Sequence, residues 1–151
     1  MKPSTIPLST LLRRDATCHS AWVFASCMSV FAALAMQGWW VDRFGQWVEP
    51  QGPLRTVGVI LGAWLLAGAV IGWRVWRVRI ALAGGRGEGW ITARHVTKLG
   101  ATLTARYKAG PLTYDTQHTV RGGPPLPVET RVMVAFPEDS PGSGIILDAL
   151  Q

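Results

Sequence analysis

The stretch "AWVFASCMSVFAALAMQGWW", residues 21–40, decides the fold class of this chain. It is 20 residues long, the length that a helix needs to cross roughly 30 Å of hydrocarbon. No Asp, Glu, Lys or Arg occurs between residues 16 and 41. We therefore predict a transmembrane helix over residues 21–40. A cleaved signal peptide is the alternative, because Arg13 and Arg14 precede the run and Ala33-Leu34-Ala35 resembles a cleavage site.

A second apolar run, "TVGVILGAWLLAGAVIGW" at residues 56–73, predicts a second transmembrane helix. A helix of this length reaches about 27 Å, so we expect Arg74 to extend its side chain outward and close the gap. A buried helix pair in a soluble protein is the alternative. The apolar residues on every face of both runs argue against it.

The basic residues predict the orientation in the membrane. Lys and Arg flank the two runs in the N-terminal tail and after residue 73, whereas the loop at residues 41–55 holds as many acidic as basic residues. Both termini are therefore expected in the cytoplasm of a bacterial inner membrane, with the loop outside. The predicted membrane-interface residues are Trp39, Trp40, Trp47, Trp73, Arg74, Trp76, Arg77 and Arg79.

The overall charge agrees with a membrane location and not with nucleic-acid binding. Charged residues make up 16% of the chain, against about 25% in a typical soluble domain. The net charge is +6, and the arginines after residue 73 would contact anionic lipid head groups as a topology anchor. No recognition motif of a nucleic-acid-binding domain accompanies them.

Small residues recur at helical spacing in both apolar runs. Such residues let helix backbones approach closely. We expect them to pack the two helices against each other as a hairpin, and a homo-oligomer interface is the alternative. The predicted helix-packing residues are Ala25, Ser29, Ala33, Gly58, Gly62, Gly68 and Gly72.

The C-terminal part of the chain changes to the pattern of short β-strands. Residues 74–89 are predicted to extend the second helix and end in a flexible hinge, "GGRGEG". Five β-branched or apolar runs follow within residues 90–151, separated by Gly and Pro. The predicted fold is a membrane α+β protein: a cytoplasmic tail at residues 1–20, a two-helix transmembrane hairpin, and a small five-stranded antiparallel β barrel or sandwich. The most apolar run, "TRVMVAF", is expected at the centre of the sheet.

Several short motifs of this C-terminal part resemble the bacterial domain of unknown function 3592 family. Tyr107 and Tyr114 match the hairpin tyrosines of that family, and "FPEDSP" stands at its Tyr-x-Pro…Pro turn. In this chain Phe136 replaces the tyrosine, and Pro137 follows it directly, with Pro141 at the second proline. The resemblance implies one or two membrane helices joined to a small β domain and no established activity.

Residues suited to chemistry are few in this sequence. His95 and His118 are expected on the surface of separate strands, and a metal site would need three or four ligands. Asp115, His118 and Ser140 or Ser143 have the residue types of a hydrolase triad, but no G-x-S-x-G motif is present. Cys18 and Cys27 are interpreted as small apolar side chains. We therefore assign no catalytic residue, metal or cofactor.

The sequence favours a non-enzymatic, membrane-anchored β module that binds another protein, as an adaptor or assembly component. Membrane lipid is the second expected partner. One alternative is a membrane-bound immunity protein that neutralises a bacterial toxin. Another is a small membrane enzyme or thiol protein, which would need a polar cluster within the membrane; Cys18, Cys27 and Gln37 are its only candidates.

Overall fold

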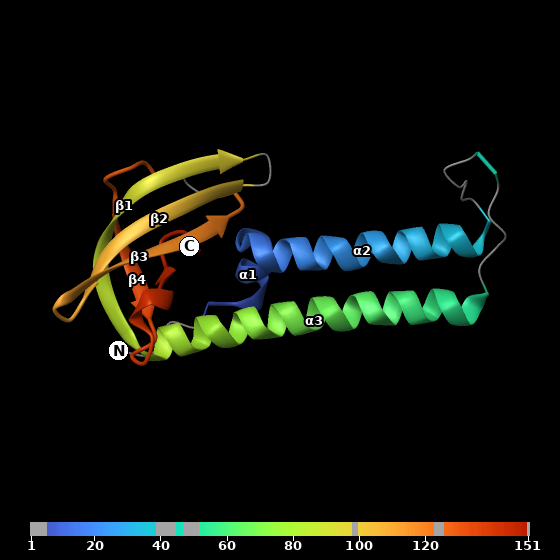
Figure 1. Cartoon of the computed structure of the whole chain (residues 1–151), viewed down its shortest axis with the longest axis horizontal. Coiled ribbons are helices and arrows are strands. Elements are labelled where there is room, and N and C mark those ends of the chain that lie inside the picture. Colours follow the sequence, from blue (N-terminus) through green and yellow to red (C-terminus); the bar gives the residue numbers. More distant parts are fainter. Residues whose placement is uncertain (1–5, 39–44, 47–51, 98–99, 123–125, 151) are drawn as a thin grey trace. The chain divides into compact units, whose positions relative to one another are not determined.

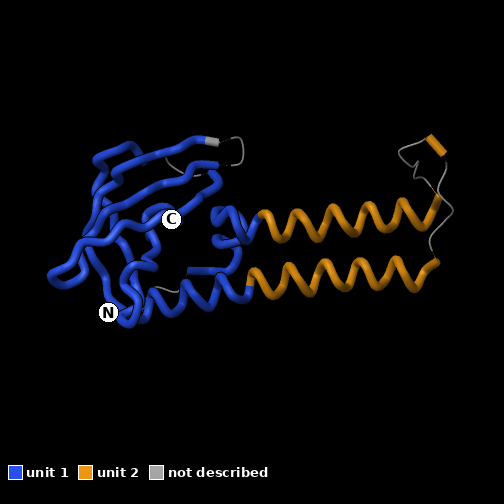
Figure 2. Tube along the Cα trace, viewed as in Figure 1, with its two compact units in different colours: residues 1–19, 72–151 blue, residues 20–71 orange. Residues whose placement is uncertain are grey.

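The computed structural model describes residues 6–38, 45–46, 52–97, 100–122 and 126–150. Contacts divide the chain into unit 1, Met1–His19 with Gly72–Gln151, and unit 2, Ser20–Ile71 (Figure 2). The elements are α1 (Leu8–Arg14), α2 (Ala16–Met36), α3 (Pro53–Ala83), β1 (Gly85–Thr97), β2 (Gly100–Ala109), β3 (Leu112–Val120), β4 (Arg131–Phe136), the 3-10 turn η1 (Pro141–Ser143) and β5 (Ile145–Ile146) (Figure 1).

Both long helices, α2 and α3, are apolar and long enough to cross a membrane. α2 begins at Ala16, before the predicted span, and ends at Met36; α3 runs from Pro53 to Ala83 and so includes the expected extension past residue 73. The short helix α1 occupies part of the expected tail and was not predicted. Most of the connecting loop lies outside the described residues, together with Trp39, Trp40 and Trp47.

In unit 2, α2 and α3 pack through alanines. Ala25 of α2 is buried in one cluster with Ala63 and Ala67 of α3. Beside this cluster, Nε1 of Trp64 donates to Oγ of Ser29 across 3.0 Å. The predicted packing roles of Ala25 and Ser29 thus agree with the structure, whereas Ala33 is exposed.

The glycines of α3 do not take part in this packing, contrary to the expectation. A Cβ atom added at Gly58, Gly62, Gly68 or Gly72 would meet no other atom within 4 Å. At 3.6 residues per turn, Gly58, Gly62 and Gly68 lie about 120–160° around α3 from the midpoint of Ala63 and Ala67, outside the packed face. Spacing shows that small residues share a helix face, but not which face meets the partner helix.

This arrangement predicts different effects for two adjacent substitutions in α3. Ala67→Leu forces a larger side chain into the packed face, so we expect it to destabilise the helix pair by about 1–3 kcal/mol. Gly68→Leu adds its side chain where a Cβ meets no neighbour and where leucine favours a helix more than glycine does, so it should not destabilise the pair. Thermal unfolding of the full-length protein in neutral detergent, followed by circular dichroism, measures both. Equal destabilisation by the two variants would contradict the assigned faces.

The strands of unit 1 form one curled antiparallel sheet in the order β3-β2-β1-β4-β5 (Figure 1). The expected number and direction of strands is confirmed, but the sheet is an open half-barrel and neither a closed barrel nor a sandwich. β1 is the central strand; β4, which contains most of "TRVMVAF", lies between β1 and β5. The curl brings β3 near the start of β5, where Oγ1 of Thr116 donates to the Gly144 carbonyl across 2.5 Å.

The long strand β1 produces this curl. Its first half, from Gly85 to Trp90, pairs with β4, and its second half pairs with β2 from Gly89 onward. The predicted hinge at residues 84–89 is therefore wrong, because most of it is strand. A Cβ atom at Gly89 would lie 2.5 Å from the Arg106 carbonyl oxygen. Glycine here serves the close approach of backbones in a bent sheet, not flexibility.

Aromatic side chains fill the concave side of the sheet. Tyr107 is fully buried, and its ring stacks on Phe136 with 5.5 Å between centroids. Tyr114 lies 6.2 Å away on the other side, and the Tyr107 hydroxyl donates to the carbonyl of Pro141. Burial raises the pKa of this hydroxyl, which keeps it protonated as a donor. Three of the five residues named for the family resemblance, Tyr107, Tyr114 and Phe136, thus pack together in the core. Pro141 contacts them through its carbonyl, and both Pro137 and Pro141 are half-buried.

Candidate functional site: a buried carboxylate beside an open strand edge

Asp15 is the centre of the most highly connected polar group among the described residues. It lies between α1 and α2 and is only 1% exposed. Its Oδ1 accepts the backbone N–H groups of Thr17 (3.0 Å) and Cys18 (3.2 Å). Asp15 therefore caps the N-terminus of α2, where the first N–H groups have no partner within the helix.

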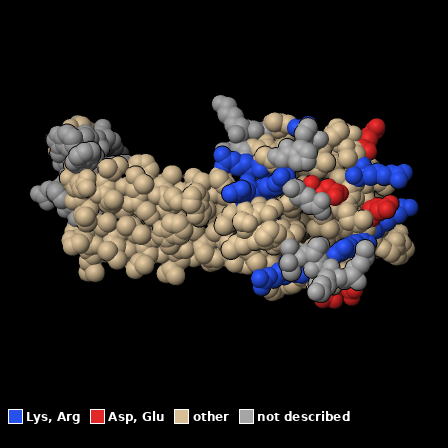
Figure 3. Space-filling view, turned by 180° about the vertical axis from the view of Figure 1, so that it is seen from behind, with Lys and Arg blue, Asp and Glu red and all other residues tan. Residues whose placement is uncertain are grey.

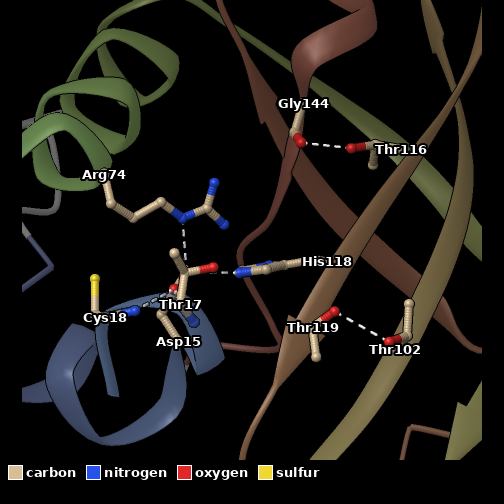
Figure 4. Close-up of polar contacts among 9 residues, drawn as sticks. All are labelled: Asp15, Thr17, Cys18, Arg74, Thr102, Thr116, His118, Thr119 and Gly144. Atoms are coloured by element: carbon tan, nitrogen blue, oxygen red, sulfur yellow. Dashed lines mark hydrogen bonds and ion pairs between the residues drawn. The ribbon is translucent and has the colours of Figure 1, made fainter. Parts of the chain in front are cut away.

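The other oxygen of Asp15 contacts two further elements of unit 1 (Figure 4). Oδ2 accepts from Nε of Arg74 in α3, at 2.8 Å, and from Nε2 of His118 in β3, at 3.2 Å. Because a carboxylate only accepts hydrogen bonds, Nε2 of His118 carries the proton. A single side chain thus joins the start of α2, the C-terminal part of α3 and the sheet.

The environment of Asp15 keeps its carboxyl group ionised. Burial by itself raises the pKa of this group. The hydrogen bond from His118, together with the charge and hydrogen bond of Arg74, outweighs burial and holds the pKa well below its usual range. The carboxylate is therefore charged throughout the neutral pH range.

His118 contradicts the expectation of a surface histidine, because it is only 3% exposed. Alternation along β3 turns Thr116, His118 and Val120 inward and leaves Asp115 and Gln117 exposed. Nδ1 of His118 is buried and has no hydrogen-bond partner among the described residues. The other strand histidine, His95, is exposed as expected.

The residues considered for a hydrolase triad do not come together. Asp115 and His118 lie on opposite faces of β3, and Asp115 forms a two-point ion pair with Arg106 at 2.8 and 3.0 Å. The hydroxyl groups of Ser140 and Ser143 form a hydrogen bond with each other, with 3.0 Å between their oxygens. The described residues also contain no group of three or more His, Cys, Asp or Glu side chains that could hold a metal ion.

The described residues of the predicted membrane interface occupy different environments within unit 1. Trp73 and Trp76 are exposed by 51% and 58%, and the Arg77 guanidinium lies 5.3 Å from the centre of the Trp73 ring. Arg79 is exposed. Arg74 is an exception: its side chain is 14% exposed and pairs with Asp15, so the expected outward extension is wrong.

The chain's own N-terminal segment pairs with one end of the edge strand β3. Asp15 forms an isolated antiparallel bridge with Val120, and the N–H of Arg121 donates to the Arg14 carbonyl across 2.7 Å. Beyond this short pairing, the described chain provides no neighbouring strand for β3 on its outer side. The part of the β3 edge that is covered by the N-terminal segment therefore ends at the cluster around Asp15.

Sequence reasoning missed the Asp15 cluster, although one local signal was present. An Asp directly before a helical apolar run is a typical N-cap. Its other partners, Arg74 and His118, are 59 and 103 residues away in the chain, and no sequence pattern relates them. Comparison with protein-family models, curated proteins and solved structures finds no match, and the family resemblance stays a prediction.

Proposed function

We propose that this chain is a non-enzymatic, membrane-anchored β module that binds another protein by strand addition at the outer edge of β3. In this proposal α2 and α3 cross the bacterial inner membrane, and both termini and the sheet lie in the cytoplasm. The distribution of Lys and Arg around the apolar helices supports that orientation.

The open edge of β3 is the observation that carries the proposal. The register of β2 with β3 is continuous from Ala101↔Val120 to Ala109↔Leu112. Because the N–H of Arg121 points outward to Arg14, the alternation of a strand turns the backbone groups of Thr113, Asp115 and Gln117 to the same outer side. Among the described residues, the outward N–H and C=O groups of these three residues have no backbone hydrogen-bond partner.

The side chains along this edge fit a foreign strand better than a second copy. An exposed row of N–H and C=O groups is a template for a pairing strand. The hydrogen bonds and charge of Arg106 hold the pKa of Asp115 below its usual value, so Asp115 is ionised. Two copies paired about Asp115 would place these carboxylates opposite each other, and like charges in that position destabilise a sheet.

The cluster around Asp15 supports this role as an anchor. Its carboxylate accepts four hydrogen bonds from α2, α3 and β3. These bonds hold β3 at its covered end, which keeps the open end in one conformation before a partner arrives. A preorganised edge loses less conformational entropy on binding.

Photo-crosslinking of the full-length protein in its native membrane tests the proposal. A photoreactive residue at Thr113 should capture one stoichiometric protein partner. Gln117→Pro removes an outward N–H without removing a bond to β2, so we expect it to reduce capture at least tenfold. Gln117→Ala is the matched control and should capture the partner as the wild type does.

The outcomes separate strand addition from other modes of binding. Unchanged capture by a folded Gln117→Pro variant would exclude strand addition at this edge. Failure of the wild type to capture any protein would exclude the interaction role itself. Circular dichroism of each variant in neutral detergent verifies that the sheet is intact.

A further inference from the structure

We propose that Arg13, Arg14 and Arg121 form a binding site for the phosphate group of an anionic phospholipid. The inference rests on the membrane location given under the proposed function and is independent of strand addition. It assigns the lipid contact to residues other than the arginines after residue 73, which were expected to contact the head groups.

Backbone contacts within unit 1 place Arg121 beside Arg14, which directly follows Arg13 in the chain. Arg13 and Arg14 are the last residues of α1, and Arg121 directly follows β3. The N–H of Arg121 donates to the Arg14 carbonyl across 2.7 Å, and the neighbouring residues Asp15 and Val120 form a bridge. The site therefore combines two segments that are far apart in the sequence and exists only in the folded unit.

No described anion neutralises this group of cations. Nη1 of Arg14 is buried and has no hydrogen-bond partner among the described residues. The neighbouring carboxylate of Asp15 is already bound to Arg74 and His118. Within the described chain neither Arg13 nor Arg121 forms an ion pair.

A phosphate group fits the chemistry of such a cluster. A guanidinium group offers its N–H donors in a planar fork that matches two phosphate oxygens. A buried donor without an acceptor is unfavourable, so a bound phosphate oxygen would satisfy Nη1 of Arg14. Arg13 and Arg121 are exposed, which leaves the group open to a ligand.

The position of the cluster in the chain favours a lipid as the source of the phosphate. Arg14 is separated only by Asp15 from α2, one of the two helices apolar enough to span a membrane. Leu8, on the same short helix as the two arginines, is apolar and 52% exposed. Figure 3 shows Lys and Arg side chains gathered over unit 1, with none on the visible helical surface of unit 2.

Titration of the full-length protein in neutral detergent with short-chain phosphatidylglycerol, read by native mass spectrometry, tests the site. One basic residue near a membrane surface contributes about fivefold in affinity, so Arg14→Gln with Arg121→Gln should weaken binding about 30-fold. Arg86→Gln with Lys108→Gln is the matched control. It removes the same charge from exposed positions of unit 1 and should retain wild-type affinity.

Three results would overturn the inference. The first is equal weakening by the two double variants, which would indicate nonspecific attraction. The second is equal affinity of the wild type for phosphatidylcholine. The third is a bound lipid displaced by excess inorganic phosphate alone, which would make free phosphate the ligand.

Two controls separate this inference from the proposed function and from misfolding. Each variant must keep the wild-type circular dichroism spectrum and unfolding temperature in neutral detergent; Arg14→Lys and Arg121→Lys, which retain the charge, should recover part of the affinity. Alkaline carbonate extraction tests the membrane location. Release of the wild type into solution would refute that location, whereas retention without preference for anionic lipid would refute only the lipid site.

Discussion

Asp15→Asn is expected to lower the free energy of unfolding of unit 1 by about 3–5 kcal/mol. Asparagine retains the shape of the side chain and still caps α2, so the cap is preserved. The change removes the charge that faces Arg74, whose side chain is only 14% exposed. A buried guanidinium without its carboxylate is the main cause of the loss. Hydrogen exchange of the β3 amides in the full-length protein measures this decrease in the free energy of unfolding.

A double-mutant cycle distinguishes ion pairing from a general packing defect. Asp15→Asn with Arg74→Gln removes both charges, so the double variant should be more stable than the sum of the two single effects predicts. Glu129→Gln, at an exposed position of unit 1, is the surface control and should change stability by less than about 0.5 kcal/mol. Additive effects of Asp15→Asn and Arg74→Gln would contradict a coupled pair.

The same carboxylate predicts the acid sensitivity of unit 1. The pKa of Asp15 is lowered in the folded state, so its stabilising contribution is fully present above the unfolded value of about 4. The contribution is lost as the pH falls below about 4 and through the folded pKa, because the unfolded state then binds the proton more readily. Hydrogen exchange after equilibration at several acidic pH values should show this loss in the wild type and not in Asp15→Asn.

Tyr107→Ala is expected to have an effect of similar size, about 3–5 kcal/mol, at the opposite end of the sheet. Tyr107 is fully buried between Tyr114 and Phe136, and its removal leaves a cavity in a small core. Urea unfolding of the full-length protein in neutral detergent, followed by the β-sheet signal, measures the change.

One further variant separates the contribution of the Tyr107 ring from that of its hydroxyl group, and a second serves as a surface control. Tyr107→Phe keeps the ring and removes only the hydroxyl that donates to the Pro141 carbonyl, so we expect a loss of about 1–2 kcal/mol. Leu112→Ala, at a position that is 58% exposed, should be nearly neutral. A loss from Tyr107→Phe as large as that from Tyr107→Ala would indicate that the hydroxyl, and not the ring, holds the turn at residues 137–144.

Local sequence patterns were enough to predict the two apolar helices and the approximate positions of five strands. Both depend on local periodicity: a run without charge sets a helix long enough to cross a membrane, and residues such as Thr116 and Gln117 alternate between the two faces of a strand. The paired aromatic positions Tyr107 and Phe136 were also visible as motifs, because each belongs to a strand or its end.

Which of these residues contact each other depends on how the elements pack. Asp15, Arg74 and His118 are brought together by packing between segments 59 and 103 residues apart in the chain, and no local pattern encodes such a distance. The same reason applies to the glycines at residues 84–89, which a flexible hinge and a tightly bent strand would both favour. The curl of the sheet and the face of α3 that meets α2 are decided by the shapes of side chains in contact, which become defined only when the elements pack.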